Sequence, residues 1–331
     1  MKVKDIGEQG LLRILQKFCP VEIVGDDCAV MATNPNQSLT ITTDMLVDGV
    51  HFSDRTTGPY YAGWRAAAAN LSDLAAMGAI PVAVTVALAV APDTAVEWVE
   101  EFYRGMTACL QEYHTPIVGG DVVRSPVVTV AITAFGQVEC DRTIRRSNAR
   151  SNWAIVATGV HGASRAGLEL LLNPEFGQNL TEVDRASLIL AHQRPKPRLD
   201  VLPVVWEILG SAGEFSIAGM DSSDGLADAI IQICRASGVG AKVDRPKIPI
   251  PDIFSEIVST EKALDWALYG GEDFELVLFL PMANAELLVE KIGNGAAIVG
   301  IATDSTDIWL TDSSGIYPDS RLKLDRGFQH F

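Results

Sequence analysis

Residues 66–78 of the chain read Ala-Ala-Ala-Ala-Asn-Leu-Ser-Asp-Leu-Ala-Ala-Met-Gly, and this stretch indicates how the first half folds. Its alanine content predicts a helix over residues 60–77, which Gly78 and the nearby Pro81 end. Residues 82–90 then form a short apolar run, which predicts a buried strand. A helix that leads directly into a buried strand indicates an α/β or α+β fold.

The same alternation of strands and helices continues on both sides of this stretch. In the first half, strands are expected over residues 38–44 and 126–135 and a helix over residues 94–113. In the second half, strands are expected near residues 153–158 and 274–280, and helices near residues 163–172 and 226–236. The polar, basic segment 139–152 is the best linker candidate. We therefore expect two domains, residues 1–140 and 141–331, each an α/β or α+β unit.

The composition narrows the class of protein. Hydrophobic residues make up 48% of the 331 residues, which is enough for a sizeable core, and the formal net charge is −16. Such an acidic surface repels nucleic acid and anionic lipid, so we expect neither as a partner. The five cysteines form no C-x-x-C pair, no apolar run is long enough to span a membrane, and the N-terminus lacks a signal peptide's apolar core. These features predict a cytoplasmic protein.

Acidic residues recur beside glycines and at the ends of predicted strands, where folding alone explains them poorly. Carboxylates gathered in this way hold hard cations, and hard cations beside glycine-rich backbone suit phosphate chemistry. Familiar phosphate-loop, dinucleotide-binding, zinc-protease and serine-hydrolase motifs are absent from the sequence. The acidic segments are Gly25-Asp26-Asp27, Thr42-Thr43-Asp44, Asp73, Gly119-Gly120-Asp121, Asp221-Ser222-Ser223-Asp224-Gly225 and Gly270-Gly271-Glu272-Asp273.

Each of these segments also has a purely structural interpretation. Asp73 is expected near the core of its helix, where it would bind metal or cap the N–H groups of a neighbouring loop. Gly119-Gly120-Asp121 would bring backbone N–H groups close to a phosphate, or would be a flexible hairpin turn. In the segment 221–225, a Ser or Asp is expected to cap the following helix, and the surplus polar atoms favour ligand binding.

Taken together and in order, these segments resemble the thiamine-monophosphate kinase family. The resemblance runs nearly end to end, from Gly25 to the closing segment 327–331. That family belongs to an ATP-binding superfamily shared with aminoimidazole ribonucleotide synthetase and selenophosphate synthetase. It implies ATP-dependent phosphorylation of thiamine monophosphate to thiamine diphosphate, with several Mg²⁺ ions. It also implies a homodimer, in which the N-terminal mixed sheets with their helices pair into a β-barrel and the C-terminal domain is an α/β sandwich that completes the site.

The resemblance also implies a role for individual residues. The metal ligands would be Asp27, Thr42, Thr43, Asp44, Asp73, Asp121, Asp221 and Asp224. ATP would be bound by Tyr103, Gly120, Asp121, Arg146 and Ser223, and the thiamine substrate by His51, Glu272 and Phe328. No general base is expected, because the acceptor is a phosphate monoester that is already mostly anionic at neutral pH. From the residues alone, His51 and Arg146 would be ordinary structural or solvated groups and Tyr103 a core residue.

Two other classes of function stay open at this point. A sister enzyme such as selenophosphate synthetase would need a reactive Cys followed by a basic residue, and Cys19-Pro20 does not fit. The hydrogenase-maturation relative needs a C-terminal Cys, whereas this chain ends in Phe331. A non-catalytic binder of thiamine phosphate or nucleotide would need fewer carboxylates. The chain departs from the family pattern at Val122, at Asn152-Trp153 and at Ser222, and no departure removes a carboxylate.

Overall fold

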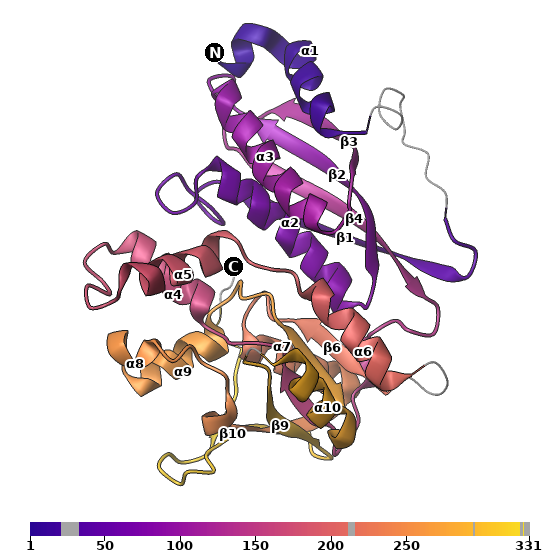
Figure 1. Cartoon of the computed structure of the whole chain (residues 1–331), viewed down its shortest axis with the longest axis vertical. Helices are drawn as coiled ribbons and strands as arrows, with labels where there is room; N and C mark the ends of the chain where they lie inside the picture. The colour runs from indigo at the N-terminus through magenta and orange to yellow at the C-terminus, as the bar shows by residue number, and fades with distance from the viewer. Residues whose placement is uncertain (21–32, 211–215, 294, 325–326, 328–331) are drawn as a thin grey trace. The chain divides into compact units, whose positions relative to one another are not determined.

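The computed structural model describes the chain outside residues 21–32, 211–215, 294, 325–326 and 328–331. Its backbone divides into two compact units (Figure 1). The first unit comprises residues 1–74 and 79–140, and the second comprises residues 75–78 and 141–331. Within the described residues, no helix combines the length and the apolar character needed to cross a membrane.

The first unit is built on a four-stranded mixed sheet with the strand order β1-β4-β2-β3. The pairs β1/β4 and β4/β2 are antiparallel, and β2/β3 is parallel. Its elements are α1 (Val3–Leu15), the 3-10 helix Gln16–Phe18, β1 (Gln37–Val47), α2 (Pro59–Ala76), β2 (Ile80–Val90), α3 (Val96–Glu112), β3 (Ile117–Arg124) and β4 (Thr129–Glu139).

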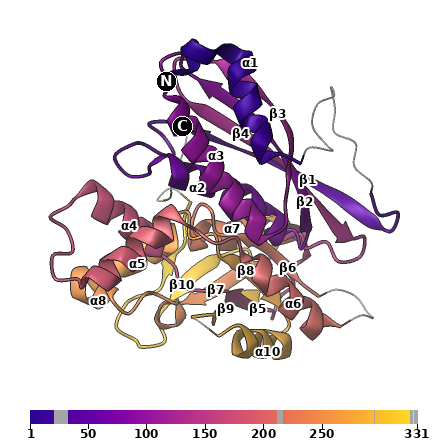
Figure 2. The same ribbon diagram turned by 45° about the horizontal axis from the view of Figure 1, so that its top comes forward.

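Only one face of this sheet is covered by the unit's own helices. Along β4, alternate residues from Val130 to Val138 are buried, while those between them are half-buried. Figures 1 and 2 show α2 and α3 side by side over the covered face. The two helices approach closely at Gly105, where an added Cβ would lie 1.7 Å from the carbonyl oxygen of Tyr60. Glycine is therefore required there by packing.

The second unit is built on a seven-stranded mixed sheet with the order β11-β10-β7-β9-β5-β8-β6. Its strands are β5 (Ala154–Ala157), β6 (Ala218–Asp221), β7 (Gly240–Asp244), β8 (Leu276–Leu280), β9 (Ala297–Thr303), β10 (Ile308–Thr311) and β11 (Ser320–Arg321). Its α-helices are α4 (Ala163–Leu172), α5 (Glu182–Gln193), α6 (Leu202–Leu209), α7 (Leu226–Ser237), α8 (Phe254–Ile257), α9 (Thr260–Tyr269) and α10 (Met282–Ile292). Short 3-10 helices cover Arg146–Asn148, Arg198–Val201 and Arg245–Lys247.

This larger sheet is buried on both faces. Along β5, Ile155 and Ala157 join one apolar cluster, which includes residues of α7, whereas Ala154 and Val156 join another, which includes residues of α6 and α10. Successive strand residues point to opposite faces, so both faces carry a core. Figure 2 shows α7 and α10 on either side of the sheet. The chain is thus an α/β protein with a four-stranded and a seven-stranded mixed sheet, which confirms the predicted α/β class and the mixed sheet of the N-terminal half.

One segment differs from its expected local structure. Gly119-Gly120-Asp121 lies inside strand β3, not in a flexible hairpin turn. An added Cβ at Gly120 would lie 2.1 Å from the carbonyl oxygen of Val86 on the neighbouring strand. Gly120 therefore serves close strand packing, and a turn is not needed to explain it.

Candidate active site

In the first unit, strand β1 and helix α2 bring Thr42, Asp44 and Asp73 into one neighbourhood. The hydroxyl of Thr42 donates a hydrogen bond to the Asp73 carboxylate. The backbone N–H of Asp44 donates to Oδ1 of Asn70 at 3.1 Å, and the Asn70 amide nitrogen donates to the Ala66 carbonyl at 3.0 Å. Asn70 is fully buried and fixes β1 against α2 beside the two carboxylates. From the sequence, no role was expected for Asn70.

The strand register places Asp44 and Asp121 on opposite faces of the sheet. Asp44 pairs with Ile132, which pairs with Val86, and both of those side chains are buried on the helix-covered face. Asp121 pairs with Ala87 and is exposed on the open face. Strands β1 and β3 are also the two edges of the sheet, about 14 Å apart at the usual strand spacing. One ion cannot bind both carboxylates of the same chain.

The alternation of side chains between the two faces of β1 separates Thr42 from Thr43. Thr42 contacts Asp73 on the covered face, whereas Thr43 lies on the open face with its hydroxyl 2.9 Å from that of Thr133. The two hydroxyls therefore lie on opposite faces of the sheet, because neighbouring strand residues point in opposite directions.

In the second unit, the turn Asp221–Gly225 joins the end of β6 to the start of α7. The Ser223 hydroxyl donates to Oδ1 of Asp221 at 3.1 Å, and the Gly225 N–H donates to the Ser222 carbonyl at 3.0 Å. Asp221 is only 2% exposed, whereas Asp224 is exposed. Gly225 is the N-cap of α7, and it has no side chain that could accept the first N–H groups of that helix. The Ser or Asp that was expected at this cap therefore lies earlier in the turn.

The segment Gly270–Glu275 lies directly against this turn. The Glu272 N–H donates to the Ser223 carbonyl at 2.7 Å. Glu272 and Phe274 both have positive φ, at 68° and 53°, which is uncommon for residues other than glycine. Backbone strain of this kind concentrates at functional sites. The backbone thus joins Ser223, which is expected to bind ATP, to Glu272, which is expected to bind the thiamine substrate.

Asp273 fixes the same segment to the start of α4. Its carboxylate accepts the N–H groups of Gly162 at 2.6 Å and Ser164 at 2.9 Å. The pKa of Asp273 is raised to about 7, mainly by burial and to a smaller extent by the nearby carboxylates of Glu275 and Glu272. The two N–H donors oppose this rise, because they stabilise the charged form.

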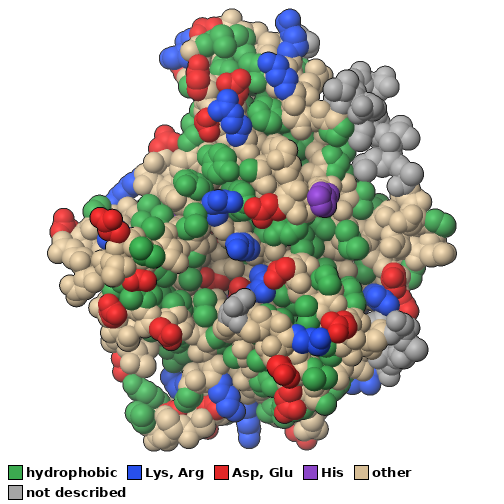
Figure 3. Space-filling view, viewed as in Figure 1, with side chains coloured by type: hydrophobic (Ala, Val, Ile, Leu, Met, Phe, Trp, Pro, Cys, Tyr) green, Lys and Arg blue, Asp and Glu red, His purple; other side chains and the backbone are tan. Residues whose placement is uncertain are grey.

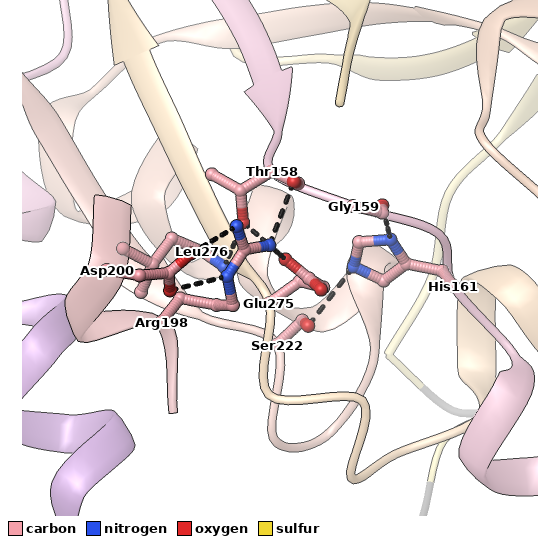
Figure 4. A network of polar contacts seen from close by, with 8 residues as sticks. All are labelled: Thr158, Gly159, His161, Arg198, Asp200, Ser222, Glu275 and Leu276. Carbon is pink, nitrogen blue, oxygen red and sulfur yellow. Dashed lines mark hydrogen bonds and ion pairs between the residues drawn. The ribbon is translucent and has the colours of Figure 1, made fainter. Parts of the chain in front are cut away.

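A buried polar network lies beneath these segments (Figure 4). Glu275 accepts a hydrogen bond from the Thr158 hydroxyl at 2.5 Å and pairs with Arg198. Arg198 also donates to the Thr158 carbonyl at 2.9 Å and contacts Asp200 at 3.0 and 3.1 Å. Burial raises the pKa of Glu275, and the charge of Arg198 opposes that rise.

His161 belongs to the same network and is fully buried. Its Nδ1 lies 3.0 Å from the Gly159 carbonyl oxygen, and its Nε2 lies 3.1 Å from the Ser222 hydroxyl. Burial lowers the pKa of His161 to about 4. No role was expected from the sequence for His161, Arg198 or Glu275, and the acidic segment Gly270-Gly271-Glu272-Asp273 was the nearest signal to Glu275.

Other residues singled out in the sequence lie on separate elements. His51 accepts the Val47 N–H at Nδ1 at 3.0 Å, which leaves the proton of the neutral ring on Nε2. Tyr103 is 4% exposed in α3, its ring 5.4 Å from that of Phe18, and burial raises its pKa. Arg146 donates to Oε1 of Gln232 at 2.9 Å.

Two predicted site residues, Asp27 and Phe328, lie outside the described residues. Every role implied by the resemblance for an individual residue stays a prediction.

The donor set fits Mg²⁺ in its chemistry, because every predicted ligand offers oxygen. Within the part of the chain that the structure describes, no three His, Cys, Asp or Glu side chains converge to enclose a metal. Mg²⁺ commonly keeps several waters and takes only one or two protein carboxylates together with substrate phosphates. The described carboxylates therefore suit ions that arrive with a nucleotide better than a closed protein cage.

The fold and these acidic motifs define an AIR synthase related protein, and the model of that family's N-terminal domain matches residues 25–138. A thiamine-monophosphate kinase from Synechococcus elongatus is 48% identical over 331 residues, covering 99% of this chain and 98% of the relative. The crystal structure of thiamine-monophosphate kinase from Stenotrophomonas maltophilia K279a superposes with a TM-score of 0.77, at 31% identity over 87% of this chain and 89% of that one. AaThiL complexed with AMPPCP and TMP superposes with a TM-score of 0.73, at 28% identity over 98% of this chain and 99% of that chain. The chain belongs to the thiamine-monophosphate kinase family.

Proposed function

We propose that the chain phosphorylates thiamine monophosphate by direct, in-line transfer of the γ-phosphoryl group of ATP, assisted by Mg²⁺. The activity of the family is the ATP-dependent conversion of thiamine monophosphate to thiamine diphosphate, the last step in making that cofactor. The observation that carries this conclusion is the 48% identity over nearly the full length of both chains. A cytoplasmic enzyme is in keeping with the acidic composition and with the free thiols of the four described cysteines.

Each unit supplies part of the residue set for the reaction. In the first unit, Asp44, Asp73 and Asp121 hold Mg²⁺. In the second unit, Asp221, Ser223 and Asp224 serve the nucleotide and its ions, and Glu272 serves the thiamine end. Bound Mg²⁺ would neutralise the charge between the two phosphate groups and align them. On the face of the second unit drawn in Figure 3, basic and acidic side chains are interspersed, which does not favour a nucleic-acid partner.

No protein base is required for this transfer. The attacking oxygen belongs to a phosphate monoester whose second pKa is about 6, so it is already largely deprotonated at neutral pH. The protein must instead place two polyanions in line and hold the ions that screen them. Thiamine itself, whose hydroxyl would need a base, is therefore expected to be a poor acceptor.

Incubation of the purified chain with ATP, Mg²⁺ and thiamine monophosphate tests the reaction. We expect thiamine diphosphate and ADP in equal amounts, with no product when EDTA replaces Mg²⁺. Unphosphorylated thiamine is the matched control acceptor. Equal turnover of thiamine and its monophosphate would contradict a mechanism without a base.

The open face of the first sheet supports a dimer in which two such sheets form a barrel. Apolar side chains are exposed along this face, at Leu39, Ile41, Met45, Ile80 and Val123. The register aligns Met45 with Asp121 through Ala131 and Ala87. An apolar sheet face of this kind needs a partner surface. Because Asp44 and Asp121 lie on opposite faces, we infer that one site takes them from two protomers.

Subunit mixing tests this arrangement directly. Asp44→Asn and Asp121→Asn should each be nearly inactive alone. When the two variants are unfolded together and refolded, mixed dimers should carry one site with both carboxylates intact. About a quarter of the parent activity should return, since half of the dimers are mixed and each has one intact site of two. Persistent inactivity of the mixture, with both homodimers folded, would show that the site takes both carboxylates from one protomer.

A further inference from the structure

Ser222 is the fixed centre of the turn between β6 and α7. It is fully buried, and its N–H donates to the Glu275 carbonyl at 2.8 Å. Its own carbonyl accepts the Gly225 N–H at 3.0 Å, and its hydroxyl lies 3.1 Å from Nε2 of His161. The backbone and the side chain of Ser222 are thus both fixed. With no exposed surface, Ser222 itself cannot contact a ligand.

The chemistry of His161 sets the direction of the bond to Ser222. Nδ1 faces a backbone carbonyl, which can only accept, so Nδ1 carries the proton. Nε2 of the neutral ring is then an acceptor, and the Ser222 hydroxyl donates to it. His161 is fully buried, so water cannot replace either bond. In this way His161, on the loop that follows β5, fixes the orientation of the Ser222 side chain.

We propose that His161 is a positioning residue that holds the turn Asp221–Gly225 in the conformation needed for Mg²⁺ and nucleotide. The inference rests on the proposed function, in which Asp221, Ser223 and Asp224 serve that end of the site. Asp221 and Ser223 flank Ser222 directly and Asp224 follows Ser223, so rotation at Ser222 displaces all three. Close positioning of charged groups governs phosphoryl transfer, and small displacements are costly.

The contacts of Ser223 limit which substrate should respond. Ser223 binds Asp221 through its side chain and accepts the Glu272 N–H through its carbonyl. Glu272 is also held from its other side, because Asp273 accepts the N–H groups of Gly162 and Ser164. Loss of the bond between His161 and Ser222 should therefore loosen the turn and leave the segment 270–275 in place. The effect should fall on ATP and not on thiamine monophosphate.

Two substitutions of His161 separate its two hydrogen bonds. In His161→Asn, the short amide can still donate to the Gly159 carbonyl but cannot reach Ser222. In His161→Gln, the longer amide can still accept the Ser222 hydroxyl and gives up the bond to Gly159. Each variant loses one buried bond, so both should lose a similar few degrees of melting temperature, about 3–8 °C. A purely structural role would make their kinetics equal as well.

We expect the two variants to differ in the site. His161→Asn should raise the KM for ATP about tenfold and leave the KM for thiamine monophosphate within about twofold, whereas His161→Gln should keep both near the parent values. Amide hydrogen exchange of residues 222–225, measured without ligands, should be about tenfold faster in the Asn variant only. Ser222→Ala should reproduce His161→Asn, and the double variant should be no worse than either.

Equal KM values and equal exchange in the Asn and Gln variants would overturn the inference, as would an effect on the KM for thiamine monophosphate alone. Failure of the proposed function would look different. In that case the unsubstituted chain would neither bind the non-hydrolysable analogue AMPPCP with Mg²⁺ in calorimetry nor form thiamine diphosphate. The exchange measurement needs no ligand and reports on the turn in either case.

Discussion

The two units place their acidic motifs on different kinds of structure. In the first unit, Asp44, Asp73 and Asp121 lie on β1, α2 and β3, so helix and strand geometry fixes where they point. In the second unit, the turn 221–225 and the segment 270–275 lie between regular elements. Buried side chains outside these two segments, such as Arg198 and His161, hold them.

This difference teaches where stability and function can be separated. A carboxylate on a regular element can lose its charge without loss of its position, because the ladder of backbone hydrogen bonds remains. A turn has no such ladder, so its geometry depends on a few buried polar side chains that must all be paired. Substitution of acid by amide should therefore affect mainly turnover in the first unit and mainly stability in the network of the second.

The largest effect is expected for Asp73→Asn. This change should lower kcat by about 10²–10⁴, because a charge that holds Mg²⁺ against the transferring phosphate is lost. The free energy of unfolding should stay within about 1 kcal/mol of the parent, since the amide oxygen can still accept the Thr42 hydroxyl. Steady-state kinetics and urea unfolding measure the two quantities.

Asp93→Asn is the matched control for this prediction. Asp93 is an exposed carboxylate of the same unit that pairs with Lys2 and Lys4. Exposed ion pairs contribute little to stability, so neither turnover nor unfolding should change measurably. Normal turnover in Asp73→Asn would support the structural interpretation of that carboxylate and remove the contrast between the units.

A smaller effect, of the opposite kind, is expected for Glu275→Gln. The change leaves Arg198 buried beside an amide, with both side chains only 13% and 16% exposed. Removal of one partner of a buried ion pair should lower the free energy of unfolding by about 2–4 kcal/mol. The kcat should fall less than tenfold, because Glu275 holds Ser222 through its backbone carbonyl, which the substitution keeps.

Arg198→Met combined with Glu275→Leu is the control for this ion pair. It removes both charges together and should be less destabilising than Glu275→Gln, which leaves the Arg198 charge with only the exposed Asp200 as its partner. The contrast between the units would fail if Glu275→Gln abolished turnover and left the unfolding free energy unchanged.

The smallest effect concerns pH, where two groups of the second unit oppose each other. The pKa of His161 is lowered from its usual 6.5 to about 4, so its contribution to stability is lost as the pH falls through that window. The pKa of Asp273 is raised to about 7, so its contribution is lost as the pH rises from about 4 to 7. Glu275, whose pKa burial also raises, acts with Asp273.

Single variants should separate these opposed contributions. Between pH 4.5 and 6.5, the stability of His161→Asn should fall with rising pH, and that of Asp273→Asn should rise, each by about 1–2 kcal/mol. The stability of the parent protein should vary less over this pH range than that of either variant. Urea unfolding at several pH values measures these slopes, and parallel profiles for all three proteins would contradict the assignment.

Local patterns were sufficient to predict α2, α3, β1, β2 and β4 in the first unit and α4, α7, β5 and β8 in the second. The helix expected over residues 163–172 is α4 (Ala163–Leu172), because its apolar period and its flanking glycine are local signals. Strand β3 was not expected, since Gly119-Gly120 is typical of a turn and its strand partner lies far along the chain. The two-residue period of β1 could have shown that Thr42 and Thr43 face apart.

Such local patterns could not predict the buried network around Glu275. Glu275 lies 77 residues from Arg198 and 117 from Thr158 in the sequence. No local period links residues so distant, and each of them alone has an ordinary explanation. Only the folded chain shows that they meet beneath the turn Asp221–Gly225.

The last turn of α2 has a consequence for anyone who would cut this protein into parts. Residues 75–78 belong to the second unit, and Ala75 and Ala76 are buried in one of its apolar clusters beside Val205. An added Cβ at Gly78 would lie 2.8 Å from the Trp206 ring. A gene fragment that starts at residue 141 would lack this piece and expose the apolar surface it covers. The two units are thus compact but not modular, and recombination between related genes at the linker would combine residues 75–78 of one parent with the second unit of the other.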